Sequence, residues 1–534
     1  MAQQSAFSTL EVMEPGNGTA DPNHYSEIWT NGRSIPTSKD PDMLYVSQSN
    51  HYYRTTMIDS LAYSTFWKGG ESTSDGLIRR SSMGVVQGLY LRVVVSNTSG
   101  NDTRLVPAPM WFQQIDLLPK GAATPLQTWY GETLFFLHSL FPSDSLDDVS
   151  KVQAFNKKWS EDGGNILRNG ETRVFYIPLL KSFVDSAPQG LNFQALTDDM
   201  VIRIRTRPYI TASGDYQLTC TAFDLIADEV YYEGAALERS DRYWLGSNIA
   251  HSADVLDPVR ISFTTPALVA SQKTNYPLSL LSGRAVAFML VCVRPQGFNH
   301  TDMALTKFVD LGPNAMVSLI DSSGVNQLSS SGIPIDFLSY ISMSGWFPGD
   351  MANGMNWFVL SATNKPAQAL LGHKDGGYFW VDNSNYQLQI TPDAAGVAQV
   401  QSIAFGSVLT AGTVMINYRG RSTQPLAYNA TAAVVKAAIE NLITAREDRL
   451  TVTISGALNS AATVTVTMSG PGIYQRFEEL VVLPLGANVT SAAVTTTTSP
   501  VRGLPTGTFQ IDCYAMCYRT VRFYKGQWEA IYMT

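Results

Sequence analysis

Short segments rich in hydrophobic residues recur along the chain and predict β-strands. Valine, isoleucine, tyrosine and phenylalanine dominate these segments, and such residues favour strands. Gly, Pro, Asn or Asp separate the segments, which is typical of an all-β sandwich. The clearest examples are Val85–Val95, Met110–Leu118, Thr172–Ile177, Met200–Thr206 and Tyr216–Phe223.

One amphipathic helix is predicted over Leu146–Trp159. Ser145 and Asp148 resemble a capping box at its start. Four apolar residues then fall on one helical stripe: Val149, Val152, Phe155 and Trp159. Helices are otherwise few, so the pattern favours an all-β fold class.

The most informative feature is an internal repeat. Residues 214–223 read Gly-Asp-Tyr-Gln-Leu-Thr-Cys-Thr-Ala-Phe, and residues 507–516 read Gly-Thr-Phe-Gln-Ile-Asp-Cys-Tyr-Ala-Met, an offset of 507 − 214 = 293. Further on, Tyr-Tyr-Glu-Gly at 231–234 is echoed by Phe-Tyr-Lys-Gly at 523–526. An earlier echo pairs residues 109–116 with 313–321, ending in Ile-Asp both times, at an offset of 321 − 116 = 205. The growing offset predicts a duplicated β domain whose second copy carries an insertion.

Composition marks the insertion independently. Between about residues 395 and 505, Ala, Val, Thr and Gly increase and aromatic residues become rare. Within it we expect a helix over Thr431–Ile443 and strands over Gly412–Tyr418, Leu450–Ser455 and Thr463–Met468. Residues 425–439 (Pro-Leu-Ala-Tyr-Asn-Ala-Thr-Ala-Ala-Val-Val-Lys-Ala-Ala-Ile) resemble a small domain of phage virion proteins and bacterial surface proteins.

The predicted organisation is two eight-stranded jelly rolls in one chain, with a small α+β domain inserted in the second. Residues 1–40 are polar and rich in Gly, Pro, Asn and Ser, which predicts an N-terminal arm. The first jelly roll is expected over residues 41–240, and the second over residues 250–395 plus 500–534. The inserted, surface-exposed decoration domain is expected over residues 396–499.

Charge narrows the possible partners. Charged residues make up 15% of the chain, against the about 25% of ordinary soluble domains, which is typical of a surface buried in an assembly and also of a large β protein. The net charge is −8 and no basic run occurs, so direct nucleic-acid binding is not expected. The start of the chain lacks the pattern of a signal peptide, and the longest apolar run, Ala285–Val293, is too short to span a bilayer.

Residues that could carry chemistry do not converge in the sequence. No two histidines have the spacing of a helical zinc site, and no P-loop or nucleophile elbow is present. The acidic pairs Asp147-Asp148 and Asp198-Asp199 are more typical of helix starts or turns. The four cysteines, Cys220, Cys292, Cys513 and Cys517, form no C-x-x-C pair. Cys513 and Cys517 would share one face of a strand, which favours buried free thiols over a metal or redox site. The tryptophans could line a sugar-binding face, but core or interface packing is favoured; they include Trp67, Trp111, Trp346, Trp357, Trp380 and Trp528. We therefore predict no catalytic, cofactor-binding or metal site, and no cofactor.

The C-terminal segment of residues 507–526 resembles the last strands of double jelly-roll major capsid proteins of tailless phages, virophages and large eukaryotic DNA viruses. The family pattern is matched in order by Tyr514-Ala515, Tyr518, Val521-Arg522-Phe523 and Gly526. The family often has small residues after that glycine, whereas this chain has Gln-Trp-Glu-Ala-Ile at 527–531.

The resemblance implies a non-enzymatic virion protein that forms a homotrimer of pseudo-hexagonal outline and tiles an icosahedral shell. Its implied partners are further copies of itself, neighbouring capsomers, penton and minor capsid proteins, and an internal membrane. Two alternatives stay open: a secreted double jelly-roll enzyme acting on glycans or glycoproteins, and a viral receptor-binding spike. The enzyme would require a cleft with convergent carboxylates, and the spike would be present in few copies per virion.

Overall fold

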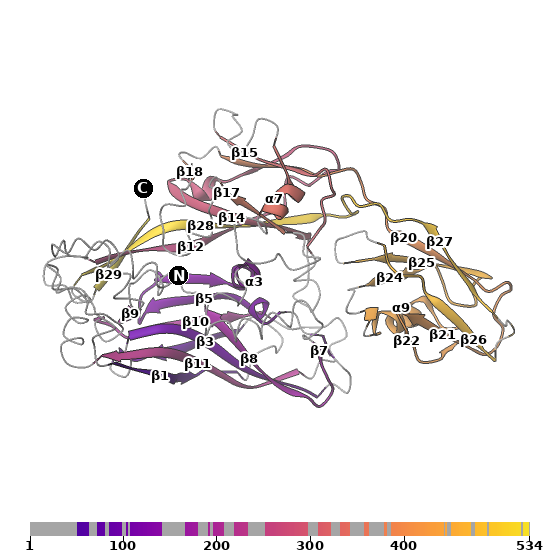
Figure 1. Ribbon diagram of the computed structural model, residues 1–534, viewed down its shortest axis with the longest axis horizontal. Coiled ribbons are helices and arrows are strands. Elements are labelled where there is room, and N and C mark those ends of the chain that lie inside the picture. The colour runs from indigo at the N-terminus through magenta and orange to yellow at the C-terminus, as the bar shows by residue number, and fades with distance from the viewer. Residues whose placement is uncertain are drawn as a thin grey trace, which may run out of the picture.

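The computed structural model describes most of the β-rich parts of the chain (Figure 1). The described residues are 51–63, 72–80, 85–98, 103–104, 107–140, 166–179, 191–192, 196–207, 218–232, 251–296, 308–321, 332–341, 357–361, 379–381, 386–442, 444–445, 450–470, 476–486, 488, 491–524 and 527–532. The predicted arm of residues 1–40 and the predicted helix Leu146–Trp159 lie outside these ranges.

Two sheets form the first roll, each with a path of four strands. One sheet has the order β1-β11-β3-β8, with bounds His51–Ser60, Leu218–Tyr232, Val85–Asn97 and Thr172–Leu179. The facing sheet has the order β2-β10-β5-β6, with bounds Ser72–Ile78, Met200–Thr206, Phe112–Pro119 and Gln127–Tyr130. Short elements join them: β9 (Leu191–Asn192) pairs with β3, β4 (Thr103–Arg104) pairs with β7 (Ile166–Leu167), and η3 (Ala108–Trp111) precedes β5.

The second roll repeats this arrangement. One sheet has the order β12-β28-β14-β17, with bounds His251–Phe263, Phe509–Tyr524, Arg284–Pro295 and Trp357–Ser361. The other has the order β13-β19-β15-β16, with bounds Thr274–Pro277, Gln387–Thr391, Met316–Ile320 and Ile333–Pro334. If the eight strands of each roll are numbered along the chain, both rolls have the sheet orders 1-8-3-6 and 2-7-4-5. Edge strands β18 (Phe379–Val381) and β29 (Gln527–Tyr532) and the 3-10 turn η6 (Ser279–Leu281) complete the second roll.

This topology confirms the predicted duplication. The stronger sequence echo falls on β11 and β28, the eighth strand of each roll, and the weaker echo falls on β5 and β15, the fourth strand of each. Most of the predicted strands are present. One start was wrong: Met110 and Trp111 lie in η3, and the strand begins only at Phe112.

Burial along the strands explains their hydrophobic patterns. In β10 the residues Met200, Ile202 and Ile204 are buried and alternate with less buried neighbours, as in a strand with one face on the core. In β14 every residue from Ala285 to Val293 is buried. A continuous apolar strand indicates burial on both faces. The longest apolar run of the sequence is therefore a strand covered on both sides.

The inserted module has its own fold and its own core. One sheet has the order β24-β25-β20-β27, with bounds Thr451–Ile454, Thr463–Ser469, Gln399–Ala404 and Ala493–Thr498. In the other, β21 (Thr413–Tyr418) pairs with β22 (Arg421–Ser422), β23 (Leu426–Ala427) and β26 (Val481–Leu485). Helix α9 (Ala432–Glu440) starts at Thr431, whose hydroxyl accepts a hydrogen bond from the Val434 amide, and it buries Val435 and Ile439.

The module lies between β19 and β28, the seventh and eighth strands of the second roll. Its core cluster is separate from the cluster that spans both rolls. Figure 1 shows it beside the rolls, beyond the ends of their strands. The predicted fold class, two eight-stranded rolls with an inserted α+β domain, is confirmed. Among the described residues, no helix has the length and apolar character needed to cross a membrane.

Candidate functional site

The acidic pairs and the histidines, which the sequence offered as candidates for catalysis or metal binding, form no such site among the described residues. Asp198 and Asp199 lie in a bend before β10, where the Asp199 carboxylate accepts a hydrogen bond from the Arg80 amide at 3.1 Å. Asp147, Asp148 and all six histidine side chains lie outside the described residues. Within the described ranges, no group of three or more His, Cys, Asp or Glu side chains could hold a metal ion.

The cysteines and the described tryptophans lie in the core. All four cysteines are free and buried, and burial raises the pKa of the Cys220 and Cys292 thiols to about 12. Trp111 and Trp357 are each 1% exposed. The predicted burial of Cys513, Cys517, Trp111 and Trp357 is confirmed, whereas the side chains of Trp67, Trp346, Trp380 and Trp528 lie outside the described residues.

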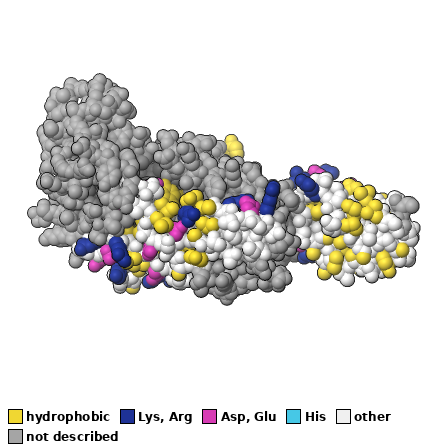
Figure 2. All heavy atoms as spheres, turned by 90° about the horizontal axis from the view of Figure 1, so that it is seen from below, with side chains coloured by type: hydrophobic (Ala, Val, Ile, Leu, Met, Phe, Trp, Pro, Cys, Tyr) yellow, Lys and Arg dark blue, Asp and Glu magenta, His cyan; other side chains and the backbone are white. Residues whose placement is uncertain are grey.

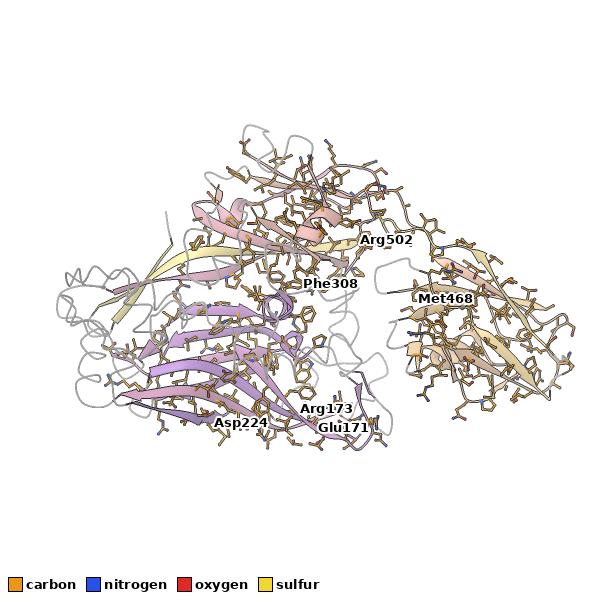
Figure 3. All side chains as sticks on the ribbon, in the orientation of Figure 1. Glu171, Arg173, Asp224, Phe308, Met468 and Arg502 are labelled. Carbon is orange, nitrogen blue, oxygen red and sulfur yellow. The ribbon has the colours of Figure 1, made fainter. Side chains whose placement is uncertain are left out.

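Several buried polar contacts lie where the two rolls meet, a region we call the seam. Helix α3 (Gly131–Leu140) directly follows β6, the fifth strand of the first roll, and packs on the outward face of the second roll's β12-β28-β14-β17 sheet. The Phe136 ring centroid lies 4.4 Å from Trp357, 5.6 Å from Phe308 and 6.3 Å from Tyr514. Figure 3 places Phe308 between the two rolls. This aromatic cluster buries the outward face of β14 and β28.

A charged network crosses the seam beside the aromatic cluster. The Glu132 carboxylate accepts hydrogen bonds from Arg207 of the first roll at 2.5 Å and from Arg294 of the second roll at 3.1 Å. Arg294 also lies 3.9 Å from Asp512 of β28, whose carboxylate accepts a hydrogen bond from the Ser262 hydroxyl. The side chains of Glu132, Arg294 and Asp512 are at most 1% exposed.

The charges of this network hold one another in the ionised state. Burial alone would raise the pKa of Glu132, but the guanidinium groups of Arg207 and Arg294 hold that pKa well below its ordinary value. A buried ion pair contributes little net stability compared with apolar packing, but loss of one partner leaves the other charge uncompensated. The network therefore penalises any rearrangement that separates the two rolls.

A second polar contact joins the edges of the two sheets. Arg519 of β28 forms an ion pair with Asp257 of β12 at 3.0 Å and donates a hydrogen bond to the Pro125 carbonyl of the first roll at 2.6 Å. The Thr128 amide of β6 donates to the same Asp257 carboxylate at 3.4 Å. The seam is thus fixed at two places, and a single hydrophobic cluster extends through both rolls.

The inserted module is attached in a different way, through two linker segments that we call the stalk. Val397 and Val501 exchange two backbone hydrogen bonds of 2.9 Å, and Ala394 and Leu504 are bonded nearby. A Cβ atom at Gly503 would lie 2.3 Å from the Ala394 carbonyl oxygen, so the two linkers pass too close for any other residue.

Charged groups hold the base of the stalk on the second roll. Arg502 pairs with Asp310 at 2.8 Å and lies 3.8 Å from Asp336 of helix α7 (Ile335–Ile341). These three side chains line a small pocket, and Figure 3 shows Arg502 where the module joins the rolls. Asp393 accepts hydrogen bonds from the Asn314 amide and side chain, each at 3.0 Å. The stalk is therefore docked on the roll by polar contacts.

Sequence reasoning missed the residues of the seam. Glu132, Arg207 and Arg294 lie far apart in the chain and belong to no motif. The continuous apolar run of β14 was the available signal, because burial on both faces requires a second structural layer over the sheet.

Comparison with known proteins identifies the fold. No protein-family model and no curated protein sequence matches the chain. Among solved structures, PBCV-1 VP54, fitted into a reconstruction of the virophage Sputnik, has a TM-score of 0.54 at 12% identity, covering 92% of this chain and 99% of VP54. A quasi-atomic model of the PBCV-1 virus capsid gives a TM-score of 0.53 at 12% identity with the same coverage.

The major capsid protein of mavirus is also similar, with a TM-score of 0.38 at 11% identity over 90% of both chains. The two PBCV-1 matches extend over nearly the whole of both chains, so the likeness includes both rolls. The strand orders of the two rolls agree independently with this assignment. The chain therefore has the double jelly-roll fold, with an α+β module inserted between the last two strands of its second roll.

Proposed function

We propose that this protein is the major capsid protein of an icosahedral virus and that it assembles as pseudo-hexameric homotrimers in the virion shell. One observation carries the proposal: the same eight-stranded topology occurs twice in the chain, and a buried seam fixes the two copies against each other. Three such chains around a threefold axis place six similar rolls in a ring. The likeness to the quasi-atomic model of the PBCV-1 virus capsid, over 92% of this chain, supports a role in a virus capsid.

A structural role accounts for the buried charges. The polar groups that converge in the seam are nearly inaccessible, with the side chains of Glu132 and Arg207 1% and 4% exposed. A substrate could not reach them without separating the rolls. These charges connect two layers of the protein, which favours a structural protein over an enzyme.

The inserted module, residues 396–499, is proposed to be a decoration on the capsid surface. Its separate core and its position beyond the strand ends support this assignment. The proposed boundaries remain 41–240 for the first roll and 250–395 plus 500–534 for the second. Residues 1–40 are proposed as an arm toward neighbouring capsomers, penton and minor capsid proteins, or an internal membrane.

Quantitative mass spectrometry and imaging of purified virions test the proposal. A major capsid protein is expected to be the most abundant virion protein, and capsomers in the shell should show six towers around a threefold axis. A few copies per particle, confined to the vertices, would instead identify a spike. Absence from the particle would leave the enzyme alternative.

A further inference from the structure

The helix after the fifth strand is present in both rolls. Helix α3 follows β6, and helix α7 follows β16 without an intervening residue. Residues 132–136 read Glu-Thr-Leu-Phe-Phe, and residues 336–340 read Asp-Phe-Leu-Ser-Tyr. A constant offset of 204 therefore pairs Glu132 with Asp336, Leu134 with Leu338, and Phe136 with Tyr340. We call the two helices the docking helices.

The first two of these residue pairs, Glu132 with Asp336 and Leu134 with Leu338, have the same surroundings in the two rolls. The first-turn carboxylate contacts an arginine from the connection between the seventh and eighth strands: Arg207 for Glu132, and Arg502 for Asp336. The leucine two residues later is buried in both helices, at 0% exposed for Leu134 and 1% for Leu338. The docking helices therefore occupy the same place in each roll.

The third residue of the pattern differs completely in exposure. Phe136 is 0% exposed, because the outward face of the second roll covers it. Tyr340 is 62% exposed, and Phe337 beside it is 50% exposed. Two exposed aromatic rings on a two-turn helix form an apolar surface of the kind found at protein interfaces.

The strand register identifies the surface that corresponds to the covering face. Trp357, which packs on Phe136, pairs with Cys292, and Cys292 pairs with Asp512. In the first roll Thr172 pairs with Ser96, and Ser96 pairs with Thr219. Asp512 and Thr219 are related by the repeat offset, since 512 − 219 = 293. Thr172 therefore occupies the position of Trp357.

Described residues on this face of the first roll are exposed in the single chain. Thr172 and Thr221 are exposed, and the hydroxyl groups of Ser96 and Thr172 are hydrogen-bonded to each other at 2.7 Å. Figure 2 looks toward this side of the first roll, where hydrophobic and charged side chains are mixed. Both equivalent positions differ between the rolls, and the differences are complementary. Within the chain, Phe136 packs on Trp357. The equivalent residues are the exposed Tyr340, which carries a hydroxyl group, and Thr172, which with Ser96 offers hydroxyl groups as hydrogen-bond partners.

We infer that helix α7 of one copy packs on the outward β1-β11-β3-β8 face of the first roll of a second copy, with Tyr340 against Ser96 and Thr172. The partner is thus another copy of this chain, and the contact repeats the seam between chains. A head-to-tail contact of this kind generates a closed ring when its rotation closes. The inference rests on the proposed trimer and assigns its interface.

Disulfide trapping tests the inference in the full-length chain. The double variant Tyr340→Cys with Thr172→Cys should form covalent dimers and trimers on oxidation, seen on a non-reducing gel. Each single variant should stay monomeric on the same gel, because the four native thiols are buried. As a matched control, Val434→Cys with Thr172→Cys should not cross-link, since Val434 is 50% exposed but lies on the inserted module.

A charged side chain at position 340 gives a second test, with the mass of the protein in solution as its readout. Tyr340→Glu should shift the mass in solution from trimer toward monomer without changing the circular dichroism spectrum, and Val434→Glu should not. A wild-type trimer that neither cross-links through the 340–172 pair nor responds to Tyr340→Glu would overturn this interface and leave the proposed function intact. A wild-type monomer at high concentration would count against the proposed function itself.

Discussion

The seam and the stalk both join folded units of one chain, but they do so by different physical means. At the seam, the two rolls share one hydrophobic cluster, and the charged residues between them are almost completely buried. At the stalk, two linkers pair through a few backbone hydrogen bonds, and Arg502 is 46% exposed. The module that they carry has a separate core.

This difference predicts which parts of the molecule unfold together. Units that share a core lose buried area together, so the two rolls should unfold as one cooperative unit. The module should open independently, because its described buried apolar residues form a cluster separate from that of the rolls.

The largest expected effect follows from Glu132→Gln. The variant keeps the shape of the side chain but removes the charge that Arg207 and Arg294 face in the seam. Loss of one partner of a buried ion pair costs about 3–5 kcal/mol of unfolding free energy. Hydrogen exchange should increase in α3, β14 and β28 and remain unchanged in α9. The control Glu478→Gln, at a 67% exposed residue, should change stability by no more than about 0.5 kcal/mol.

The same variant should alter the dependence of stability on pH. The folded pKa of Glu132 is lowered, so its contribution is fully present above the unfolded pKa of about 4.3 and is lost as the pH falls below that value. The difference in stability between wild type and Glu132→Gln should therefore be constant from about pH 7 to 5 and shrink in stronger acid. A difference that grows on acidification would contradict an ionised Glu132.

The two equivalent aromatic positions provide the next test. Phe136→Ala removes a ring that is 0% exposed and should cost about 3 kcal/mol. Tyr340→Ala removes a ring that is 62% exposed and should cost less than about 0.5 kcal/mol in a dilute monomer. Chemical denaturation of both variants measures the contrast, and equal losses would mean that α7 is covered within the single chain.

A core substitution in the module tests its independence. Ile439 is 0% exposed in the module core, and Ile439→Ala should cost the module about 2–3 kcal/mol. Hydrogen exchange should then rise in α9 and β24, while exchange in β11 and β28 stays at the wild-type level. Faster exchange in both rolls as well would show that the module and the rolls unfold together.

The smallest effect is expected for Arg502→Met at the base of the stalk. A partly exposed ion pair contributes within about 1 kcal/mol, so global stability should hardly change. Limited proteolysis should nevertheless cut the linker around residues 499–508 faster than in wild type, because contacts to Asp310 and Asp336 are lost. As a control, Arg419→Met breaks an exposed ion pair inside the module and should leave that cleavage rate unchanged.

The sequence predicted the fold better than the contacts between its parts. Duplication, the insertion and most strands followed from the repeat at offset 293 and from hydrophobic periodicity, because these patterns are local. The seam did not follow, because Glu132, Arg207 and Arg294 come from three separate segments that only the fold brings together. The offset of 204 that pairs the docking helices can be read from the sequence. The interface inferred from it depends on the structure, which shows that Phe136 is buried and Tyr340 is exposed.

The most direct test of the central claim is the mass of the purified protein by light scattering on a sizing column. The predicted result is a particle of three chains, three times 58.4 kDa, that resists moderate salt and heat. A protein that stays at 58.4 kDa over a wide range of concentrations would contradict assembly into pseudo-hexameric capsomers.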